Sequence, residues 1–176
     1  MSTSERQVTI REFSPGDEEA FWRLNQEWIV RHFAMELKDE QTLRDPQGAV
    51  LSKGGRIFFA VQDGEPVGCC ALVFRKPGEF ELAKMAVAES HRRAGIGRRV
   101  LEQVIAEALS MGVARLYLET NQTLVAAIRL YESMGFTHVP PERVEASEYS
   151  RANVFMELAL HHPAVYDVAE SLPRPA

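Results

Sequence analysis

The residues with the clearest chemical potential lie in one stretch, MAVAESHRRAGIGRR, over residues 85–99. Gly95 and Gly97 lack β-carbons, so a ligand can approach their backbone closely. Apolar residues recur after them with a period near 3.6 and predict a helix over 95–111 that begins at these glycines. The start of a helix has free N–H groups and about half a positive charge. The stretch is therefore predicted to bind an anion.

Four arginines surround this turn: Arg92, Arg93, Arg98 and Arg99. A cation at a helix N-terminus is unfavourable by several tenths of a kcal/mol, so helix stability alone favours Asp or Glu there. An anion of more than one charge explains the arginines, and the alternative is a solvated basic patch. A P-loop is excluded, because no Gly-x4-Gly-Lys-Ser/Thr sequence occurs.

The rest of the chain predicts a mixed α/β domain that positions this turn. Two turns, Asp63-Gly64 and Lys76-Pro77-Gly78, separate three strands that should pair antiparallel. The expected strands cover 7–13, 57–62, 66–75, 79–88, 114–119, 136–139 and 153–160. The expected helices cover 17–36, 39–52 with a break at Asp45-Pro46, 95–111 and 123–133. With 176 residues, we expect one domain over 1–160 and a loosely held tail over 161–176.

Composition excludes several classes of protein. The net charge of −5, from 20 basic and 25 acidic residues, argues against nucleic-acid binding. No apolar run approaches the roughly 18 to 20 residues of a membrane span, and no secretory signal is visible, so we expect a cytoplasmic protein. No metal-ligand spacing occurs. Cys69 and Cys70 are adjacent in an expected strand, point to opposite faces, and are expected as buried free thiols.

A second motif, AIRLYESMGF, covers residues 127–136. It resembles the "A-I-x-L-Y-x-x-x-G-F" signature of the GNAT superfamily, the GCN5-related N-acetyltransferases, and Arg92-x-x-Gly95-x-Gly97 resembles their motif A. The two occur in the family's order, and the resemblance covers roughly residues 6–160. It implies an α/β fold with a mixed sheet that splays between the fourth and fifth strands. It also implies acetyl transfer from acetyl-CoA to a primary amine, by direct attack in a ternary complex.

The resemblance further implies the residues that bind acetyl-CoA, the co-substrate. Backbone N–H groups from Arg93 to Arg98 would hold the pyrophosphate, and Met85 and Val87 would hold the thioester and the pantetheine arm. The Met85 amide would polarise the thioester carbonyl. The whole implied set is Met85, Ala86, Val87, Arg92, Arg93, Ala94, Gly95, Ile96, Gly97 and Arg98.

One position departs from the family pattern. Many relatives carry an asparagine seven residues before the tyrosine, where this chain has Leu124. Asn121 is nearby but out of phase, and we expect it to cap the following helix. A contact to the pantetheine arm is therefore missing or replaced.

Two residues are candidates for catalysis. An amine of pKa about 10.4 is only about one part in 2,500 neutral at pH 7, a barrier of about 4.6 kcal/mol, so a general base is useful. The resemblance places that base at Glu81, with Glu79 as the substitute; the alternative is that both are solvated strand charges. We expect Glu81 to share a strand face with Met85 and, about 13 Å from it, to act through water. Tyr131 is the implied general acid for the leaving thiolate, with core packing as its alternative.

The acceptor and two rival functions stay open. Acidic walls suit a cationic amine such as a polyamine or an amino sugar, and basic ones suit the carboxylate of an amino acid. The candidate wall residues are His32, Glu36, Asp39, Glu40, Glu142, Glu145 and Glu148 on one side, and Arg31, Arg75, Arg143 and Arg151 on the other. A homodimer is a family expectation only. The rivals are a non-catalytic acyl-CoA sensor and a nicotinamide-dependent oxidoreductase. Gly95-x-Gly97 and Glu119 favour the oxidoreductase, whereas Val100 in place of a third glycine argues against it.

Overall fold

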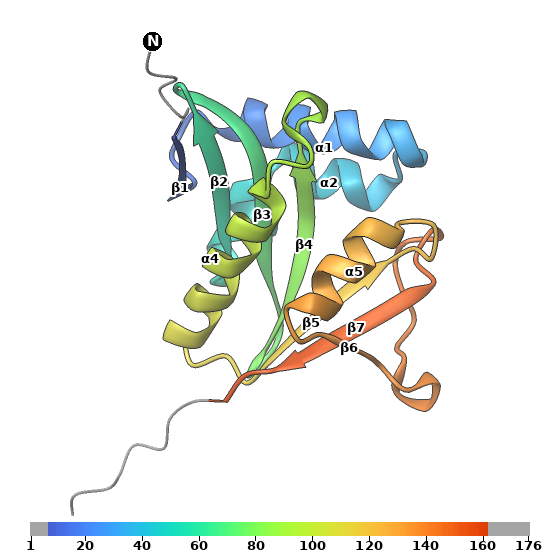
Figure 1. Ribbon diagram of the computed structural model, residues 1–176. Coiled ribbons are helices and arrows are strands. Elements are labelled where there is room, and N and C mark those ends of the chain that lie inside the picture. The colour runs from blue at the N-terminus through green and yellow to red at the C-terminus, as the bar shows by residue number, and fades with distance from the viewer. Residues whose placement is uncertain (1–6, 162–176) are drawn as a thin grey trace, which may run out of the picture.

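Seven strands form one sheet in the order β1-β2-β3-β4-β5-β7-β6 in the computed structural model, which describes residues 7–161 (Figure 1). All neighbouring strands are antiparallel except β4 and β5, which run parallel. The strands are β1 (Val8–Glu12), β2 (Arg56–Gln62), β3 (Glu65–Lys76), β4 (Glu79–Val87), β5 (Arg115–Thr120), β6 (Thr137–His138) and β7 (Val154–Ala159). The first six residues of the expected domain, and the expected tail from residue 162 on, lie outside the described residues.

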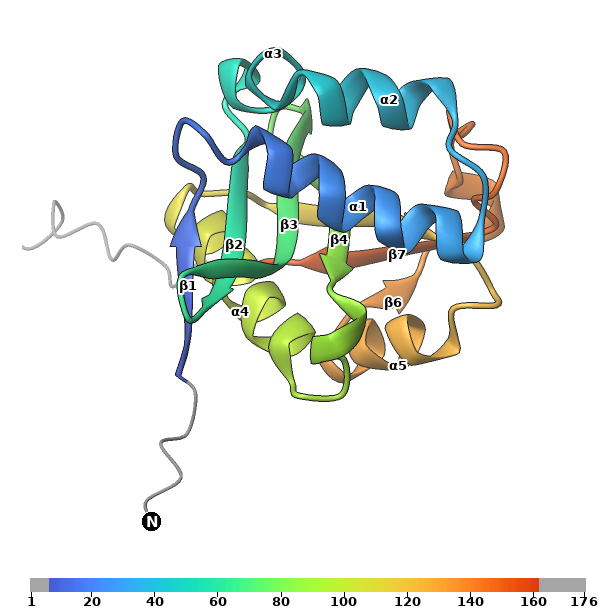
Figure 2. The ribbon, with the colours of Figure 1, turned by 90° about the horizontal axis from the view of Figure 1, so that it is seen from above.

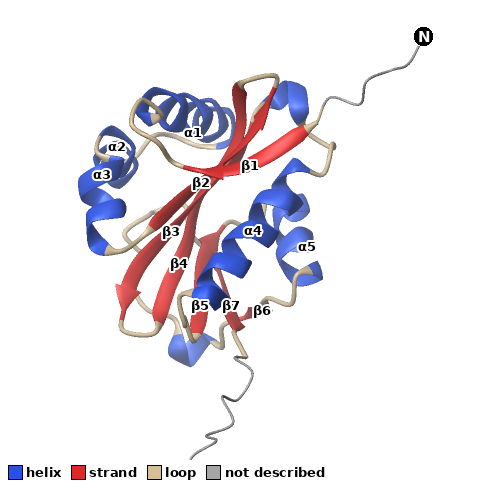
Figure 3. Ribbon diagram, turned by 90° about the vertical axis from the view of Figure 1, so that its left-hand side faces the viewer, coloured by secondary structure: helices blue, strands red, loops and turns tan. Residues whose placement is uncertain are grey.

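Helices cover both faces of the sheet, as Figures 2 and 3 show. α1 (Glu18–His32), α2 (Leu37–Arg44) and α3 (Pro46–Ala49) lie on one face, and α4 (Ile96–Ser110) and α5 (Val125–Ser133) lie on the other. The element order confirms the expected one. The expected break at Asp45-Pro46 is also present, because proline lacks the N–H that a helix interior needs and clashes with the preceding turn.

Two apolar cores, one on each face, hold these layers together. Under α4 and α5 the core includes Val100, Leu101, Leu116 and Met156. Under α1 it includes Phe21, Leu24, Ile29 and Phe59. Cys70 belongs to the first core and Cys69 to the second, and both are free, which confirms the expected pair of buried thiols. Burial raises the pKa of both thiols, that of Cys69 to about 12.

The parallel strands β4 and β5 separate soon after they meet. They pair only from Glu79 opposite Arg115 to Glu81 opposite Tyr117. Beyond these positions β4 continues to Val87 and β5 to Thr120, and the two strands diverge (Figure 1). The expected splay between the fourth and fifth strands is therefore confirmed.

A β-bulge in β4 changes which side chains share a face. Cys69 pairs with Ala86 and Ala71 pairs with Ala83, so two residues, Lys84 and Met85, stand opposite one residue of β3. Lys84 has a left-handed φ of 53°, uncommon for a residue with a side chain.

The extra residue reverses the alternation of side chains along the strand. Leu82 and Met85 therefore both pack on the α4 side. Glu81 stands opposite Val73, which packs on the α1 side. Glu81 and Met85 thus lie on opposite faces, and the expectation that they share one was wrong.

Candidate active site

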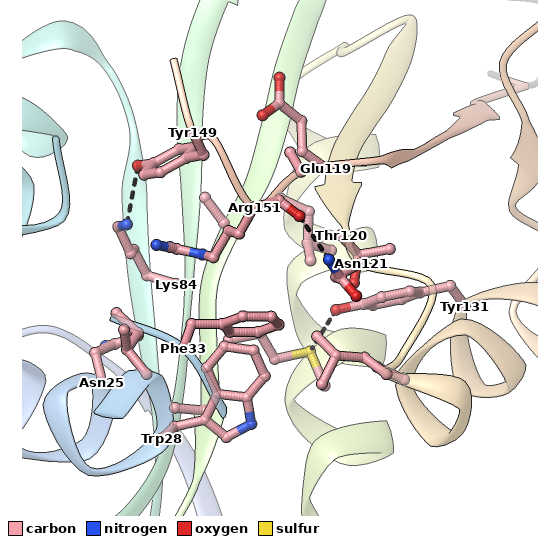
Figure 4. Close-up of a pocket in the computed structure, with 18 of the residues that line it drawn as sticks. Asn25, Trp28, Phe33, Lys84, Glu119, Thr120, Asn121, Tyr131, Tyr149 and Arg151 are labelled. Atoms are coloured by element: carbon pink, nitrogen blue, oxygen red, sulfur yellow. Dashed lines mark hydrogen bonds between the residues drawn. The ribbon is translucent and has the colours of Figure 1, made fainter. Parts of the chain in front are cut away.

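A cavity of about 190 Å³ opens where β4 and β5 diverge (Figure 4). Its walls come from β4, the end of β5, α1, α5 and the loop that precedes β7. Of the residues expected at the site, it brings together Glu81, Met85, Ala86, Val87, Arg92 and Tyr131. The other expected cofactor residues, Arg93, Ala94, Gly95, Ile96, Gly97 and Arg98, do not line it and lie in the loop and first turn of α4.

The start of α4 is built around its two glycines. Gly95 is the N-cap of α4 with a left-handed φ of 74°, a conformation that favours glycine. A β-carbon at Gly97 would lie only 3.1 Å from Met85 Cε and 3.7 Å from Leu130 Cδ2. Gly97 therefore lets α4 approach β4 and α5 closely, in addition to leaving its backbone open to a ligand.

Three of the four arginines near this turn, Arg92, Arg98 and Arg99, have different surroundings. The Nη2 atom of Arg92 is buried and has no hydrogen-bond partner in the described part of the chain, although this residue lines the cavity. In contrast, Arg98 donates to Ser133 Oγ at 2.8 Å, and Arg99 donates to the carbonyl oxygen of Val8 at 2.6 Å. Arg98 and Arg99 thus fasten α4 to α5 and β1. Burying an unpaired charged donor costs several kcal/mol, so Arg92 fits a site for an anionic ligand such as a pyrophosphate.

Glu81 presents a carboxylate to the cavity without a protein partner. Within residues 7–161 its side chain forms neither a hydrogen bond nor an ion pair. Burial raises its pKa to about 7, and the neighbouring carboxylate of Glu119 adds to the rise. The cations that oppose this rise are Arg75, Lys84 and Lys38. At neutral pH the carboxyl group is thus about half ionised and is matched to accept a proton.

Glu79 lies two residues earlier on the same face of β4, yet it does not line the cavity. It is 5% exposed and pairs with Arg75 at 2.5 Å and with Arg115 at 2.7 Å. Two cations occupy its carboxylate, so the structure favours Glu81 over Glu79 as a proton acceptor.

Tyr131 both packs in the core and presents its hydroxyl to the cavity. Its ring packs against Phe136, with centroids 5.9 Å apart, and the side chain is 7% exposed. Its hydroxyl faces the cavity and lies 3.9 Å from Met85 Sδ (Figure 4). Burial raises the pKa of the phenol, so the hydroxyl stays protonated at neutral pH and can donate a hydrogen bond.

Asn121 does not cap α5, contrary to expectation. Its Oδ1 accepts from the backbone N–H of Thr123 at 2.9 Å, which makes a local turn, and α5 begins only at Val125. Its Nδ2 donates to the carbonyl oxygen of Arg151 at 2.7 Å (Figure 4). Asn121 therefore ties the end of β5 to the loop before β7, and Leu124 lines the cavity beside it.

Sequence reasoning missed a buried polar group that we call the Asp39 cluster: Glu36, Asp39, Lys84, Tyr149 and Arg151. Arg151 donates two hydrogen bonds of 2.7 Å to Asp39 and one of 3.0 Å to Glu36. Lys84 Nζ donates to Asp39 at 2.6 Å. It also donates to the Tyr149 hydroxyl at 2.9 Å (Figure 4). Burial alone would raise the pKa of Asp39, but these hydrogen bonds outweigh it and lower the pKa to about 2. Glu36, Asp39 and Arg151 had been named only as separate wall charges, and nothing in the sequence pairs them with Lys84.

Most of the charges expected to form the acceptor wall are in ion pairs with other protein side chains. Each candidate arginine has a carboxylate partner: Arg31 pairs with Glu89, Arg75 with Glu79 and Glu145, Arg143 with Glu157, and Arg151 with Glu36 and Asp39. Among the acidic candidates, Glu148 pairs with Lys38 and Glu40 with Arg44.

No described helix is long and apolar enough to cross a membrane. Over the same residues, 7–161, no three His, Cys, Asp or Glu side chains gather as a metal site.

Comparison with known proteins identifies the family. Residues 16–136 match the model of the Acetyltransferase (GNAT) family. The ribosomal protein bS18-alanine N-acetyltransferase of Escherichia coli is 43% identical over 65 residues, which cover 37% of this chain and 44% of the relative. In the first two curated relatives, the matched region covers 58% and 44% of the relative's own length, so this chain matches about half of each.

Solved structures share the fold. An acetyltransferase of the GNAT family from Staphylococcus aureus superposes with a TM-score of 0.80 at 20% identity, over 88% of this chain and 100% of that chain. The yncA structure from Salmonella typhimurium, which holds its cofactor acetyl-CoA, superposes with a TM-score of 0.70 at 23% identity, over 92% and 99% of the two chains. The expected α/β fold is thus confirmed. Since the family model covers well over half of its residues, the chain belongs to the GNAT acetyltransferase family.

Proposed function

We propose that the protein transfers an acetyl group from acetyl-CoA to a primary amine of a small molecule, by direct attack in a ternary complex. One observation carries the proposal: Glu81 and Tyr131, an unpaired carboxylate and a protonated phenol, line one cavity beside the GNAT motif. When bound, acetyl-CoA supplies the activated thioester.

Residues at both sides of the gap are suited to hold acetyl-CoA. The unpaired Nη2 of Arg92 and the backbone N–H groups at the start of α4 would bind the pyrophosphate. Met85, Ala86 and Val87 line the cavity and would hold the thioester end, with the Met85 amide as oxyanion donor. Their position on β4 and the family resemblance support these roles.

Glu81 accepts a proton from the attacking amine, directly or through one water. An ordinary glutamate of pKa 4.5 is a poor match for an ammonium of pKa about 10.4. The rise to about 7 lowers the cost of proton transfer by about 3 kcal/mol. Because the bulge puts Met85 on the other face, Glu81 faces the acceptor from the side of α1 and α2.

Tyr131 donates a hydrogen bond to the departing sulfur. A thiolate has a pKa near 8.5, and a phenol at its ordinary value near 10 gives up its proton to it only at a cost of about 2 kcal/mol. Burial of Tyr131 increases that cost. We therefore assign it a hydrogen-bonding role during the transfer, with the proton passing late.

Contacts beside the cavity support a small acceptor, since they involve Arg151, which lines it. Glu36 and Arg151 join the start of α2 to the loop before β7, and the backbone N–H of Ser150 donates to Glu36 at 2.9 Å. Lys38 and Glu148 add a second link of 3.0 Å between the same segments. Figure 2 shows the start of α2 beside this loop. A polypeptide lying across this edge would have to break these links, whereas a small amine would not.

The test is release of thiol from acetyl-CoA by the full chain, with amines, amino acids, amino sugars and short peptides as acceptors. The proposal expects turnover with a small amine that falls at least about tenfold in Tyr131→Phe. Turnover with peptides alone would overturn the small-molecule acceptor. A rise in the thermal midpoint with acetyl-CoA, without turnover of any acceptor, would favour the non-catalytic sensor.

A further inference from the structure

On the acceptor side of the cavity, the cations are paired with carboxylates of the protein and the carboxylates that line the cavity are not paired with cations of the described residues. This side is the wall formed by Glu81, Lys84, Glu119, Tyr149 and Arg151. Its two cations and its two carboxylates have different surroundings, which decide what kind of ligand the wall can bind.

Both cations of the wall are already neutralised. Arg151 and Lys84 each donate to the fully buried Asp39, at distances of 2.6 to 2.7 Å, and Arg151 also pairs with Glu36. Breaking a buried ion pair is costly, because it leaves a charge unpaired away from water. A carboxylate on the acceptor would have to displace one of these partners.

Among the residues that the structure describes, neither carboxylate of the wall has a cationic partner. Glu81 has no partner among the described residues, and Glu119 accepts only from two hydroxyls, those of Ser147 at 2.5 Å and Tyr117 at 3.3 Å. Glu81 stands opposite Tyr117 in the β4–β5 register, and Glu119 lies two residues, about 7 Å, further along the same face of β5. Two carboxylates that face one cavity repel each other, and a cation between or beside them removes that repulsion.

We infer that the acceptor is a short diamine, or a related amine with a second cationic group and no carboxylate, whose second ammonium ion pairs with Glu119. The inference rests on the proposed function and names its substrate class. In the transfer the N–C bond forms and the C–S bond breaks. The reacting nitrogen loses two protons, one to Glu81 and one that ends on the released thiol, while the second ammonium ion keeps its charge.

Three acceptors with the same four-carbon chain and the same reacting amine test this inference. They are 1,4-diaminobutane, butylamine and 4-aminobutanoate, which end in an ammonium ion, a methyl group and a carboxylate. We expect kcat/KM for the diamine to exceed that for butylamine by about tenfold or more, mainly through KM. 4-Aminobutanoate should react more slowly than butylamine.

Variants of Glu119 assign the preference to this side chain. Glu119→Gln should reduce the ratio of diamine to butylamine to about threefold or less, and Glu119→Asp should restore much of it. Glu142→Gln, a matched change at an exposed residue outside the cavity, should leave the ratio as in the unaltered chain.

The outcomes separate the inference from the function on which it rests. Equal rates for the three acceptors, a preference for 4-aminobutanoate, or an unchanged ratio in Glu119→Gln would overturn the inference alone. No thiol release with any of the three, from protein whose thermal midpoint rises with acetyl-CoA, would overturn transfer to small amines as well.

Discussion

Two glutamates on the same face of β4, two residues apart, have opposite surroundings. At the paired end of the β4–β5 ladder, Glu79 is held between Arg75 and Arg115, and Arg115 continues to Glu157 at 2.5 Å. At the open end, Glu81 faces a cavity, and no cation of residues 7–161 lies within ion-pair distance of it. The first arrangement satisfies charge where the strands must stay together. The second leaves a carboxylate with a raised pKa where they separate. Two positions of one strand, two residues apart, thus hold a carboxylate paired with two arginines and a carboxylate left without a cation among the described residues.

The largest expected effect comes from the Asp39 cluster, which borders the open end. Asp39→Asn leaves Lys84 and Arg151 buried with a weakened partner, so we expect the free energy of unfolding to fall by about 3–5 kcal/mol. Urea unfolding measures it. Glu148→Gln, which removes an exposed pair with Lys38, should change stability by less than about 1 kcal/mol. Similar values for the two variants would mean that the cluster is not a buried ion pair.

Glu81→Gln should make the protein more stable at pH 8. The folded state holds the Glu81 proton up to about pH 7, whereas the unfolded chain releases it near 4.5. Stability that depends on this group is therefore present below pH 4.5 and lost as the pH rises through 7. The amide has no charge to bury, so the variant should gain up to about 3 kcal/mol at pH 8 and little at pH 4.5. An equal change at both pH values would contradict the raised pKa.

Glu79→Gln should have the opposite sign. It removes a carboxylate that serves two arginines, so we expect a loss of about 2 kcal/mol in urea unfolding at pH 8. Because Glu79 does not line the cavity, kcat should stay within about threefold. A loss of activity larger than the loss for Glu81→Gln would reverse the assignment of the two residues.

The smallest expected effect concerns Arg92, in the loop between β4 and α4. Arg92→Gln removes a buried donor that has no partner in the described part of the chain. We expect KM for acetyl-CoA to rise about five- to tenfold, with the free energy of unfolding unchanged or higher. Arg98→Gln is the control, because it breaks a contact to Ser133 and should reduce stability instead. Unchanged KM for acetyl-CoA in Arg92→Gln would remove this residue from the binding site.

The features that sequence predicted best are local. The helix over Ile96–Ser110 follows from the apolar periodicity, and the turn at Gly95 follows from the conformational freedom of glycine. The bulge was not predictable in this way, because Lys84 adopts a left-handed φ in a segment without glycine or proline. It arises from the register of β4 against β3, and it moved Met85 to the face opposite Glu81.

The polar partners of the site depend on contacts across long stretches of chain. Asp39 meets Lys84 across 45 residues and Arg151 across 112 residues. Sequence reasoning named Arg31, Arg75, Arg143 and Arg151 as candidates to bind a substrate carboxylate, and the fold gives each of them a carboxylate of the protein. Which charges remain for a ligand is therefore decided by tertiary pairing rather than by composition.

The pH dependence of kcat/KM for butylamine, in the unaltered chain and in Glu81→Gln, tests the central claim most directly. If Glu81 accepts the amine proton, kcat/KM should rise with unit slope to about pH 7 and then level off. The amine then binds as the ammonium ion, and ionised Glu81 removes its proton before attack. In Glu81→Gln only the neutral amine can react, so the value should be about a hundredfold lower at pH 7 and keep rising through pH 9. Profiles of the same shape in both proteins, rising through pH 8 and 9, would contradict the account.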